Sequence, residues 1–103
     1  MIRVKVYKKN KVINKITFRG HANYDEIGKD IVCAACSATI LTTLNGIFSI
    51  DKSTIGIKGK DNNIDVNIIK NDEITLKLIN NMLSSLKSIS KNYPKNIEVI
   101  EEE

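Results

Sequence analysis

The sequence is poor in aromatic residues, histidine and proline. Its 103 residues include two Phe, three Tyr, one His, one Pro and no Trp. The core must therefore be built mainly from Ile, Leu and Val, and few aromatic side chains are present on which nucleobases could stack. We expect no direct binding of nucleic acid.

Cysteine is also scarce, since only Cys33 and Cys36 are present. With the single His21 they offer three ligands, one fewer than a structural zinc site needs, so no metal is expected. The N-terminus alternates apolar and charged residues where a signal peptide needs a continuous apolar stretch, and no run of about 20 apolar residues is evident. We therefore expect a cytoplasmic protein that does not cross a membrane and whose cysteines stay reduced.

The charge balance is mildly basic. The sequence has 16 Lys and Arg residues and 12 Asp and Glu residues, which gives a net charge of +4. The basic residues are spread from Arg3 to Lys95 without a dense block, which favours a solvated surface over a dedicated phosphate-binding stripe. A non-enzymatic, ribosome-associated binding module is the alternative function that this charge leaves open.

Hydrophobic periodicity predicts the secondary structure. Residues 1–19 alternate in the manner of a β-hairpin, and 54–58 and 64–69 suggest a second hairpin. A helix is expected from Asp30, as N-cap, to about Phe48, and a second helix from Asn71 or Asp72 to a point before Pro94. A short strand around 97–99 completes the order ββαββαβ. We expect one domain over residues 1–103, of the two-layer α+β class, with a small five-stranded, mainly antiparallel sheet and two helices on one face.

The stretch that carries chemistry runs from Gly20 to Ala38 and holds His21 and both cysteines. With Asp30 as N-cap, Cys33 is the third helical residue, where the positive end of the helix dipole favours a thiolate. First-turn backbone N–H groups have no partners within the helix and could stabilise an oxyanion. His21, at the end of the preceding strand, can serve as the base if residues 22–29 loop back.

Residues 22–29 have a composition that suits a mobile lid or a substrate contact. Gly20 and Gly28 give the loop conformational freedom, and Tyr24 and Ile27 are its only sizeable apolar side chains. An ordered loop with Tyr24 packed on the domain is the alternative.

Asp30 and Ser37 are possible supporting residues. Asp30 is expected mainly as an N-cap and could also orient His21 as the third member of a triad. Ser37 shares a helical face with Cys33, and its hydroxyl could bond to a helix carbonyl or donate toward the thiolate or substrate.

Cys33-Ala-Ala-Cys36 also has the C-x-x-C form of a thiol–disulfide redox site. This interpretation is the weaker one, because such sites usually belong to a parallel βαβ context, whereas an apparent hairpin precedes this helix. Cys36 is most simply a buried helical residue.

The residues 20–22 (Gly-His-Ala), 28–34 (Gly-Lys-Asp-Ile-Val-Cys-Ala) and 37–38 (Ser-Ala) resemble the signature of the ribosomal-processing cysteine protease Prp family. The length and element order fit as well, although only residues 20–38 are specific. Cys36 departs from the family's pattern, in which a small residue without a thiol is more usual at that position.

The resemblance implies a homodimeric α+β cysteine endopeptidase that removes a short N-terminal extension from a bacterial large-subunit ribosomal protein. Cys33 is then the nucleophile and His21 its base, with the motif's Asp and Ser at Asp30 and Ser37. The implied cut follows paired aromatic residues and proceeds through a thioester, for which no cofactor is required.

Overall fold

A computed structural model describes all residues from 1 to 103 and contains seven elements in the predicted order ββαββαβ. The strands are β1 (Ile2–Lys9), β2 (Val12–Arg19), β3 (Ile55–Lys60), β4 (Asn63–Ile68) and β5 (Ile97–Glu102), and the helices are α1 (Ile31–Ile50) and α2 (Glu73–Asn92). The predicted elements are confirmed, with boundaries shifted by one to three residues; the largest shift is at the end of β5.

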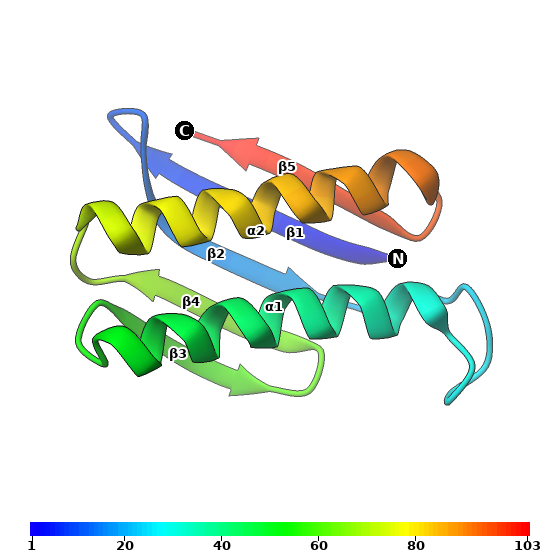
Figure 1. The fold of residues 1–103 in the computed structure, drawn as a ribbon. Coiled ribbons are helices and arrows are strands. Elements are labelled where there is room, and N and C mark those ends of the chain that lie inside the picture. The colour runs from blue at the N-terminus through cyan, green and yellow to red at the C-terminus, as the bar shows by residue number, and fades with distance from the viewer.

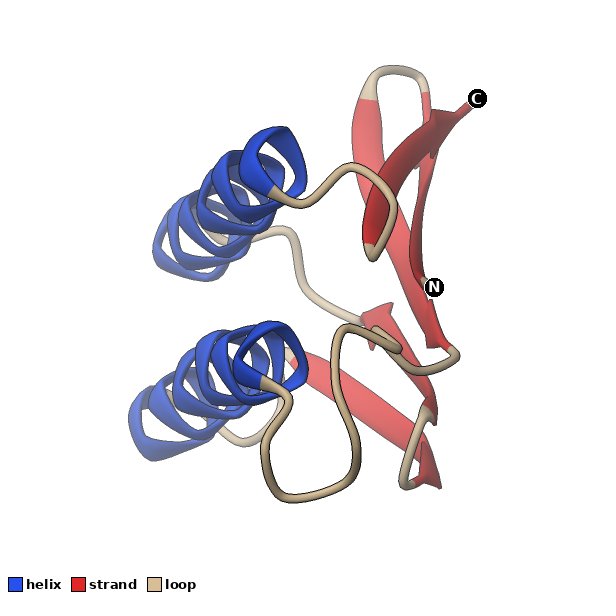
Figure 2. Cartoon of the chain, turned by 90° about the vertical axis from the view of Figure 1, so that its right-hand side faces the viewer, coloured by secondary structure: helices blue, strands red, loops and turns tan.

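The five strands form one sheet in the order β3-β4-β2-β1-β5. Every neighbouring pair is antiparallel except β1 and β5, which are parallel. Both helices lie on the same face of the sheet (Figures 1 and 2). This arrangement confirms the expected two-layer α+β class with a mainly antiparallel sheet.

The core between the layers is aliphatic, as the scarcity of aromatic residues predicted. It is formed mainly by the inward side chains of the central strands and by one face of each helix, including Val4, Ile16, Ile47, Ile79 and Leu86. Burying such side chains stabilises each by about 1.5–3 kcal/mol relative to leaving it exposed. Ile74, in the first turn of α2, is 55% exposed and lines a cavity with Ile47 and Ile50 at the end of α1.

Helix α1 is more apolar than expected. It has 20 residues, and an 18-residue window in it reaches a mean hydropathy of 1.8, so it is long and apolar enough to span a membrane. The expectation that no segment has this composition was wrong, since the polar residues of α1 are all uncharged. Core helices of globular proteins share this property, and here Val32, Cys36, Ile40, Leu44 and Ile47 of α1 are buried in the core.

Candidate active site

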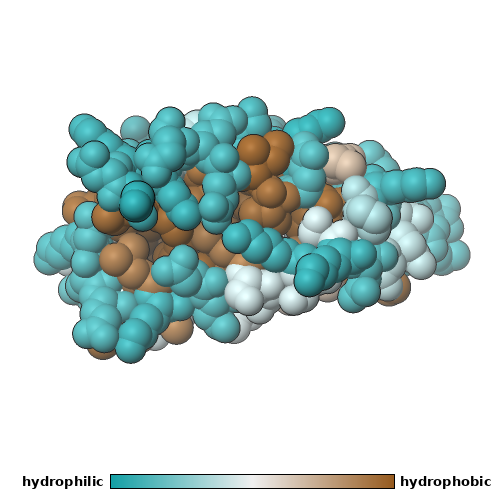
Figure 3. Space-filling model, turned by 90° about the horizontal axis from the view of Figure 1, so that it is seen from above, coloured by the Kyte–Doolittle hydropathy of each residue, from teal (hydrophilic) through white to brown (hydrophobic).

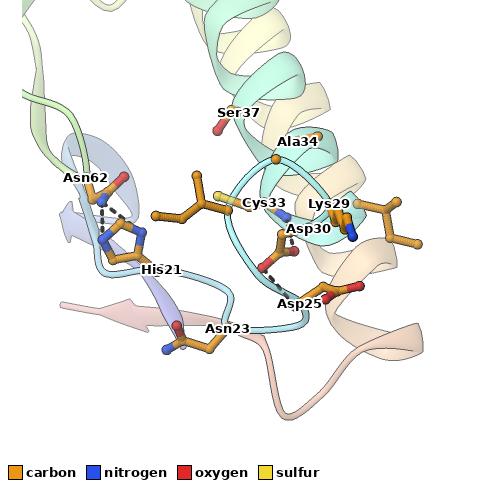
Figure 4. A pocket seen from close by; sticks show the side chains of 12 residues that line it. His21, Asn23, Asp25, Lys29, Asp30, Cys33, Ala34, Ser37 and Asn62 are labelled. Carbon is orange, nitrogen blue, oxygen red and sulfur yellow. Dashed lines mark hydrogen bonds between the residues drawn. The ribbon is translucent and has the colours of Figure 1, made fainter.

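A cavity of about 530 Å³ opens at the N-terminus of α1 and is lined by both predicted catalytic residues. His21 and Asn62 lie on one side of it, and Cys33, Ala34 and Ser37 belong to the helix on the other side (Figure 4). His21, Cys33 and Ser37, which the sequence analysis singled out, therefore line one cavity. No hydrogen bond joins His21 to Cys33, and the imidazole instead contacts Asn62.

Cys33 is placed by the start of α1. Asp30 is the N-cap, as predicted, and its Oδ1 accepts the Cys33 N–H at 2.9 Å. The Cys33 side chain is half-buried and its thiol is not in a disulfide. The thiol thus lies one turn into a helix that runs without a charged residue to Ile50, where the helix dipole favours a negative charge.

Asp30 holds the loop as well as the helix. Its Oδ2 accepts the backbone N–H groups of Tyr24 at 2.9 Å and Asp25 at 3.4 Å. Partial desolvation acts to raise the pKa of this carboxyl, but the backbone N–H donors, Cys33 first among them, hold the pKa below its usual value. Asp30 has no hydrogen bond to His21, so its observed role is to shape the site through the backbone.

Two first-turn N–H groups are already engaged. The Cys33 N–H donates to the Asp30 carboxylate, and the Ala34 N–H donates to the Asp30 carbonyl at 3.1 Å. These two groups are not free to serve as oxyanion donors in this conformation, which leaves fewer of the first-turn N–H groups that the sequence suggested for that role.

Gly20 sets the position of His21 at the end of β2. Its φ of +90° is one that side chains rarely adopt, and a Cβ there would lie 2.4 Å from the Met1 carbonyl oxygen. Only glycine allows the end of β2 to pass this close to the start of β1. His21 then follows directly and points into the cavity.

The loop over residues 22–29 is anchored at its start and exposed beyond it. Ala22 is buried, and its carbonyl accepts a hydrogen bond from Asn96 Nδ2 at 2.9 Å. The Tyr24 ring packs edge-on against Tyr93, with centroids 5.3 Å apart, yet Tyr24 stays 47% exposed. Ile27 is 100% exposed and lines the cavity with Gly28. The packing of Tyr24 on the domain, given above as the alternative to a lid, is therefore present for that side chain.

Ser37 lies one turn after Cys33 and lines the same cavity. Its hydroxyl makes no hydrogen bond to a helix carbonyl, unlike the hydroxyls of Thr39 and Thr43 in the next turns. Ser37 also borders a smaller cavity of about 100 Å³, whose walls are mostly apolar and include Phe18, Cys33 and Leu41. Cys33 thus lies between the larger cavity, most of whose lining residues are polar, and the smaller one, most of whose lining residues are apolar.

Whole-chain comparisons place the protein in a known family. The model of the family described as cysteine protease Prp matches residues 1–98. The chain belongs to the Prp family of cysteine proteases. It is therefore a cysteine protease, and the interpretation as a non-enzymatic ribosome-associated module was wrong.

Individual relatives agree with this assignment. The ribosomal processing cysteine protease Prp of Staphylococcus aureus (strain Mu50) is 33% identical over 94 residues, which cover 84% of this chain and 85% of the relative. The crystal structure of an essential ribosomal processing protease Prp from S. aureus, with a covalently linked product peptide, has a TM-score of 0.93 at 26% identity and covers 99% of this chain and 100% of its own. SMU.848 from Streptococcus mutans has a TM-score of 0.84 at 23% identity, covers 98% of this chain and 93% of its own, and supports the fold alone.

Within this protease the two cysteines differ in environment. Cys36 faces the core and is 1% exposed. Burial, with smaller contributions from Cys33 and Asp30, raises the pKa of the Cys36 thiol to about 11. Cys36 is thus a buried helical residue, as predicted. No three His, Cys, Asp or Glu side chains lie together in a way that could hold a metal ion.

Asn62 is the residue of the site that sequence reasoning missed. It lies in the turn between β3 and β4, 41 positions from His21, and its Nδ2 is 3.0 Å from His21 Nδ1. The sequence of residues 59–63 indicates only a turn, and the pairing of β4 with β2 is what brings that turn beside His21. No local pattern contains this information.

Proposed function

We propose that the protein is an endopeptidase that removes a short N-terminal extension from a large-subunit ribosomal protein, with Cys33 as nucleophile and His21 as base. The observation that carries this proposal is the shared cavity of His21 and Cys33 in a chain of the Prp family. The S. aureus relative is named for ribosomal processing, and its crystal structures include one with a substrate peptide and one with a covalently linked product peptide.

The proposed reaction uses two steps. Cys33 Sγ attacks the scissile carbonyl carbon, the C–N bond breaks, and His21 transfers the thiol proton to the leaving amine, which leaves a thioester. A water molecule then attacks the thioester with His21 as base, and the acid product and the Cys33 thiol are released. Neither step calls for a cofactor. The mostly apolar pocket beside Cys33 suits the aromatic residues that the family resemblance places before the cut.

The direct test is incubation with the organism's own ribosomal protein precursor, followed by intact-mass analysis. We expect one N-terminal truncation with the wild-type protein. The His21→Ala variant should lose cleavage while its melting temperature stays close to that of the wild type, because His21 is exposed and contributes little to the core. An uncleaved precursor, or a large fall in melting temperature for His21→Ala, would contradict the proposed roles.

We further propose that the protein is a cytoplasmic homodimer in which a second copy covers the outward face of α1. Ile31 and Leu41 are 58% and 53% exposed, and no charged residue interrupts α1. An uncharged, partly apolar helix face of this length is unusual for a surface exposed to water. Two copies of α1 would shield each other without burying a charge.

Leu41→Glu tests this interface. We expect the mass measured by light scattering to fall from that of a dimer to that of a monomer, because the new carboxylate would be desolvated against its own symmetry mate. Ser84→Glu, at an exposed position on α2, is the matched control and should stay dimeric. A wild-type protein that is monomeric at micromolar concentration would contradict the proposal.

A further inference from the structure

Asn62 makes the closest side-chain contact to the proposed catalytic base. Its Nδ2 lies 3.0 Å from His21 Nδ1 and closer still to Nε2, and Asn62 lines both the polar cavity and the apolar pocket beside Cys33. Figure 4 shows the Asn62 amide directly against the His21 imidazole. The contact between Asn62 and His21 therefore lies within the candidate active site.

The backbone of Asn62 fixes the same strand end. The Gly20 N–H donates to the Asn62 carbonyl at 3.1 Å, one residue before His21. The β2–β4 ladder ends immediately before this bond, with Arg19 opposite Asn63. Asn62 thus holds both the main chain that carries His21 and the ring itself.

The chemistry of an amide suits this position. A neutral imidazole has one donor and one acceptor nitrogen, whereas an imidazolium has two donors. Because an Asn side chain presents NH₂ at one end and a carbonyl oxygen at the other, it can hydrogen-bond the ring in either protonation state. The Asp30 carboxylate, the other candidate to orient His21, is occupied by the N–H groups of Cys33, Tyr24 and Asp25.

We propose that Asn62 is the positioning residue of this protease. Its amide contacts both ring nitrogens of His21 here, and in the working site it would keep a hydrogen bond to one of them and leave the other for the Cys33 thiol. The proposal rests on the catalytic roles proposed above for His21 and Cys33. A triad of Cys, His and an amide side chain is a chemically complete solution for a cysteine nucleophile. Here the amide would come from the β3–β4 turn, which lies beside the end of β2 although it is 41 positions from His21 in the sequence.

The kinetic arm of the test uses Asn62→Ala. We expect kcat to fall by roughly 10–100-fold with little change in KM, because a misplaced base slows chemistry more than binding. Asn63→Ala is the matched control, since Asn63 is the exposed neighbour in β4 and does not contact His21. An unchanged kcat in Asn62→Ala would overturn the proposal. So would a fall in melting temperature large enough to account for the lost activity by unfolding.

The spectroscopic arm does not depend on catalysis. His21 is the only histidine, so its ring protons can be titrated by NMR without assignment ambiguity, in the inactive Cys33→Ala background. Asn62→Asp should shift the midpoint of this titration to higher pH by about one unit or more, because a carboxylate in contact favours the imidazolium. Asn63→Asp should shift it much less.

The two arms separate the failure of this proposal from the failure of the proposed function. Equal shifts in Asn62→Asp and Asn63→Asp would overturn the contact between Asn62 and the ring. A precursor that the wild-type protein leaves intact would instead overturn the proposed function, whatever the titration shows.

Discussion

Helices α1 and α2 have the same length and the same kind of start, but they carry different chemistry. Each has 20 residues and an Asp N-cap whose carboxylate accepts the N–H of the third helical residue, Cys33 in α1 and Thr75 in α2. Thr75 is 3% exposed and belongs to the core, whereas Cys33 is half-buried and lines a cavity. The cap motif alone therefore does not distinguish a structural helix start from a catalytic one.

The connection before each helix accounts for the difference. The chain passes from β4 to α2 within residues 69–72, and backbone bonds from Ile69 and Lys70 to the Thr54 carbonyl hold this segment. The chain before α1 runs from Gly20 to Asp30 and returns over the helix end, where Tyr24 and Asp25 donate to Asp30. A longer connection leaves the first turn of α1 accessible and places a histidine beside it.

The outward faces of the two helices also differ, since α2 carries charged residues there and α1 carries none. In α2, Glu73 and Lys77 form an i,i+4 ion pair at 3.1 Å, and Lys87 pairs with Glu101 of β5 at 3.1 Å. Hydrophilic side chains cover most of the molecule on the side where α2 and β5 lie, with hydrophobic atoms showing between them (Figure 3). The outward face of α1 carries no charged residue and no ion pair; its exposed polar residues are Ser, Thr and Asn.

The largest contrast is expected at the third helical residue. Cys33→Ala should reduce cleavage by roughly 10³-fold or more, since the nucleophile is lost, with little change in melting temperature. Thr75→Ala should do the reverse, with full activity and a loss of about 1 kcal/mol of stability at a buried site. Peptide cleavage and thermal unfolding on both variants make the comparison. Residual cleavage by Cys33→Ala near the wild-type rate would exclude Cys33 as the nucleophile.

A smaller contrast is expected at the two N-caps. Asp72→Ala should cost stability without loss of activity, about 0.5–2 kcal/mol for a lost cap. Asp30→Ala should in addition lower kcat by roughly 10–100-fold, because the same carboxylate orients the loop and the Cys33 backbone. If both variants keep full activity, Asp30 is a cap and nothing more.

The pH dependence of stability gives Asp30 a second signature. Its pKa is lower in the folded protein than its usual value of 3.8. The stabilisation from the carboxylate is therefore fully present above that value and is lost as the pH falls through the folded pKa. Melting temperatures of the wild type and Asp30→Asn should differ at neutral pH and converge as the pH falls below the lowered pKa of the folded protein. A constant difference over this range would contradict the lowered pKa.

The two connections should also differ in hydrogen exchange. In the inactive Cys33→Ala protein we expect fast exchange over most of residues 22–29, where Ile27 and its neighbours are exposed, and slowing of roughly tenfold or more when substrate peptide binds. Residues 69–72 should exchange at the same rate with and without peptide. Strong protection of residues 25–28 in the free protein would contradict a lid.

The features that sequence predicted were local. The hairpin of residues 1–19, the N-cap Asp30 and the pair His21 and Cys33 are each contained in a short continuous segment of the sequence. The end of α1 was placed two residues early, at Phe48, because neither glycine nor proline marks it. The membrane-like composition of α1 was missed because Thr, Ser and Asn interrupt its apolar pattern without adding a charge.

The features that sequence did not predict depend on long-range pairing. Strand β4 inserts between β3 and β2, and β5 returns parallel to β1 at the other edge. Asn62 reaches His21 only because of the first of these pairings. Hydrophobic alternation predicts which face of a strand is buried, but it does not predict which strand pairs with it.

The smallest effect is expected at Cys36, on the inner face of α1. Its pKa of about 11 keeps the thiol protonated at neutral pH, and its side chain is 1% exposed. A thiol alkylator should therefore modify Cys33 much faster than Cys36, because the thiolate is the reactive form. Peptide mapping by mass spectrometry after brief labelling measures both rates in one sample.

Replacement of Cys36 separates the protease from a redox protein that shares the same C-x-x-C. Cys36→Ala should cleave substrate within about threefold of the wild-type rate and lose about 1–2 kcal/mol of stability, since it removes one buried sulfur from a packed core. Under a thiol–disulfide mechanism both cysteines are needed, so Cys36→Ala would be as inactive as Cys33→Ala, and a Cys33–Cys36 disulfide would form during turnover. The two cysteines lie on one helix and three positions apart, so their unequal response would show that burial, and not spacing, decides which of them reacts.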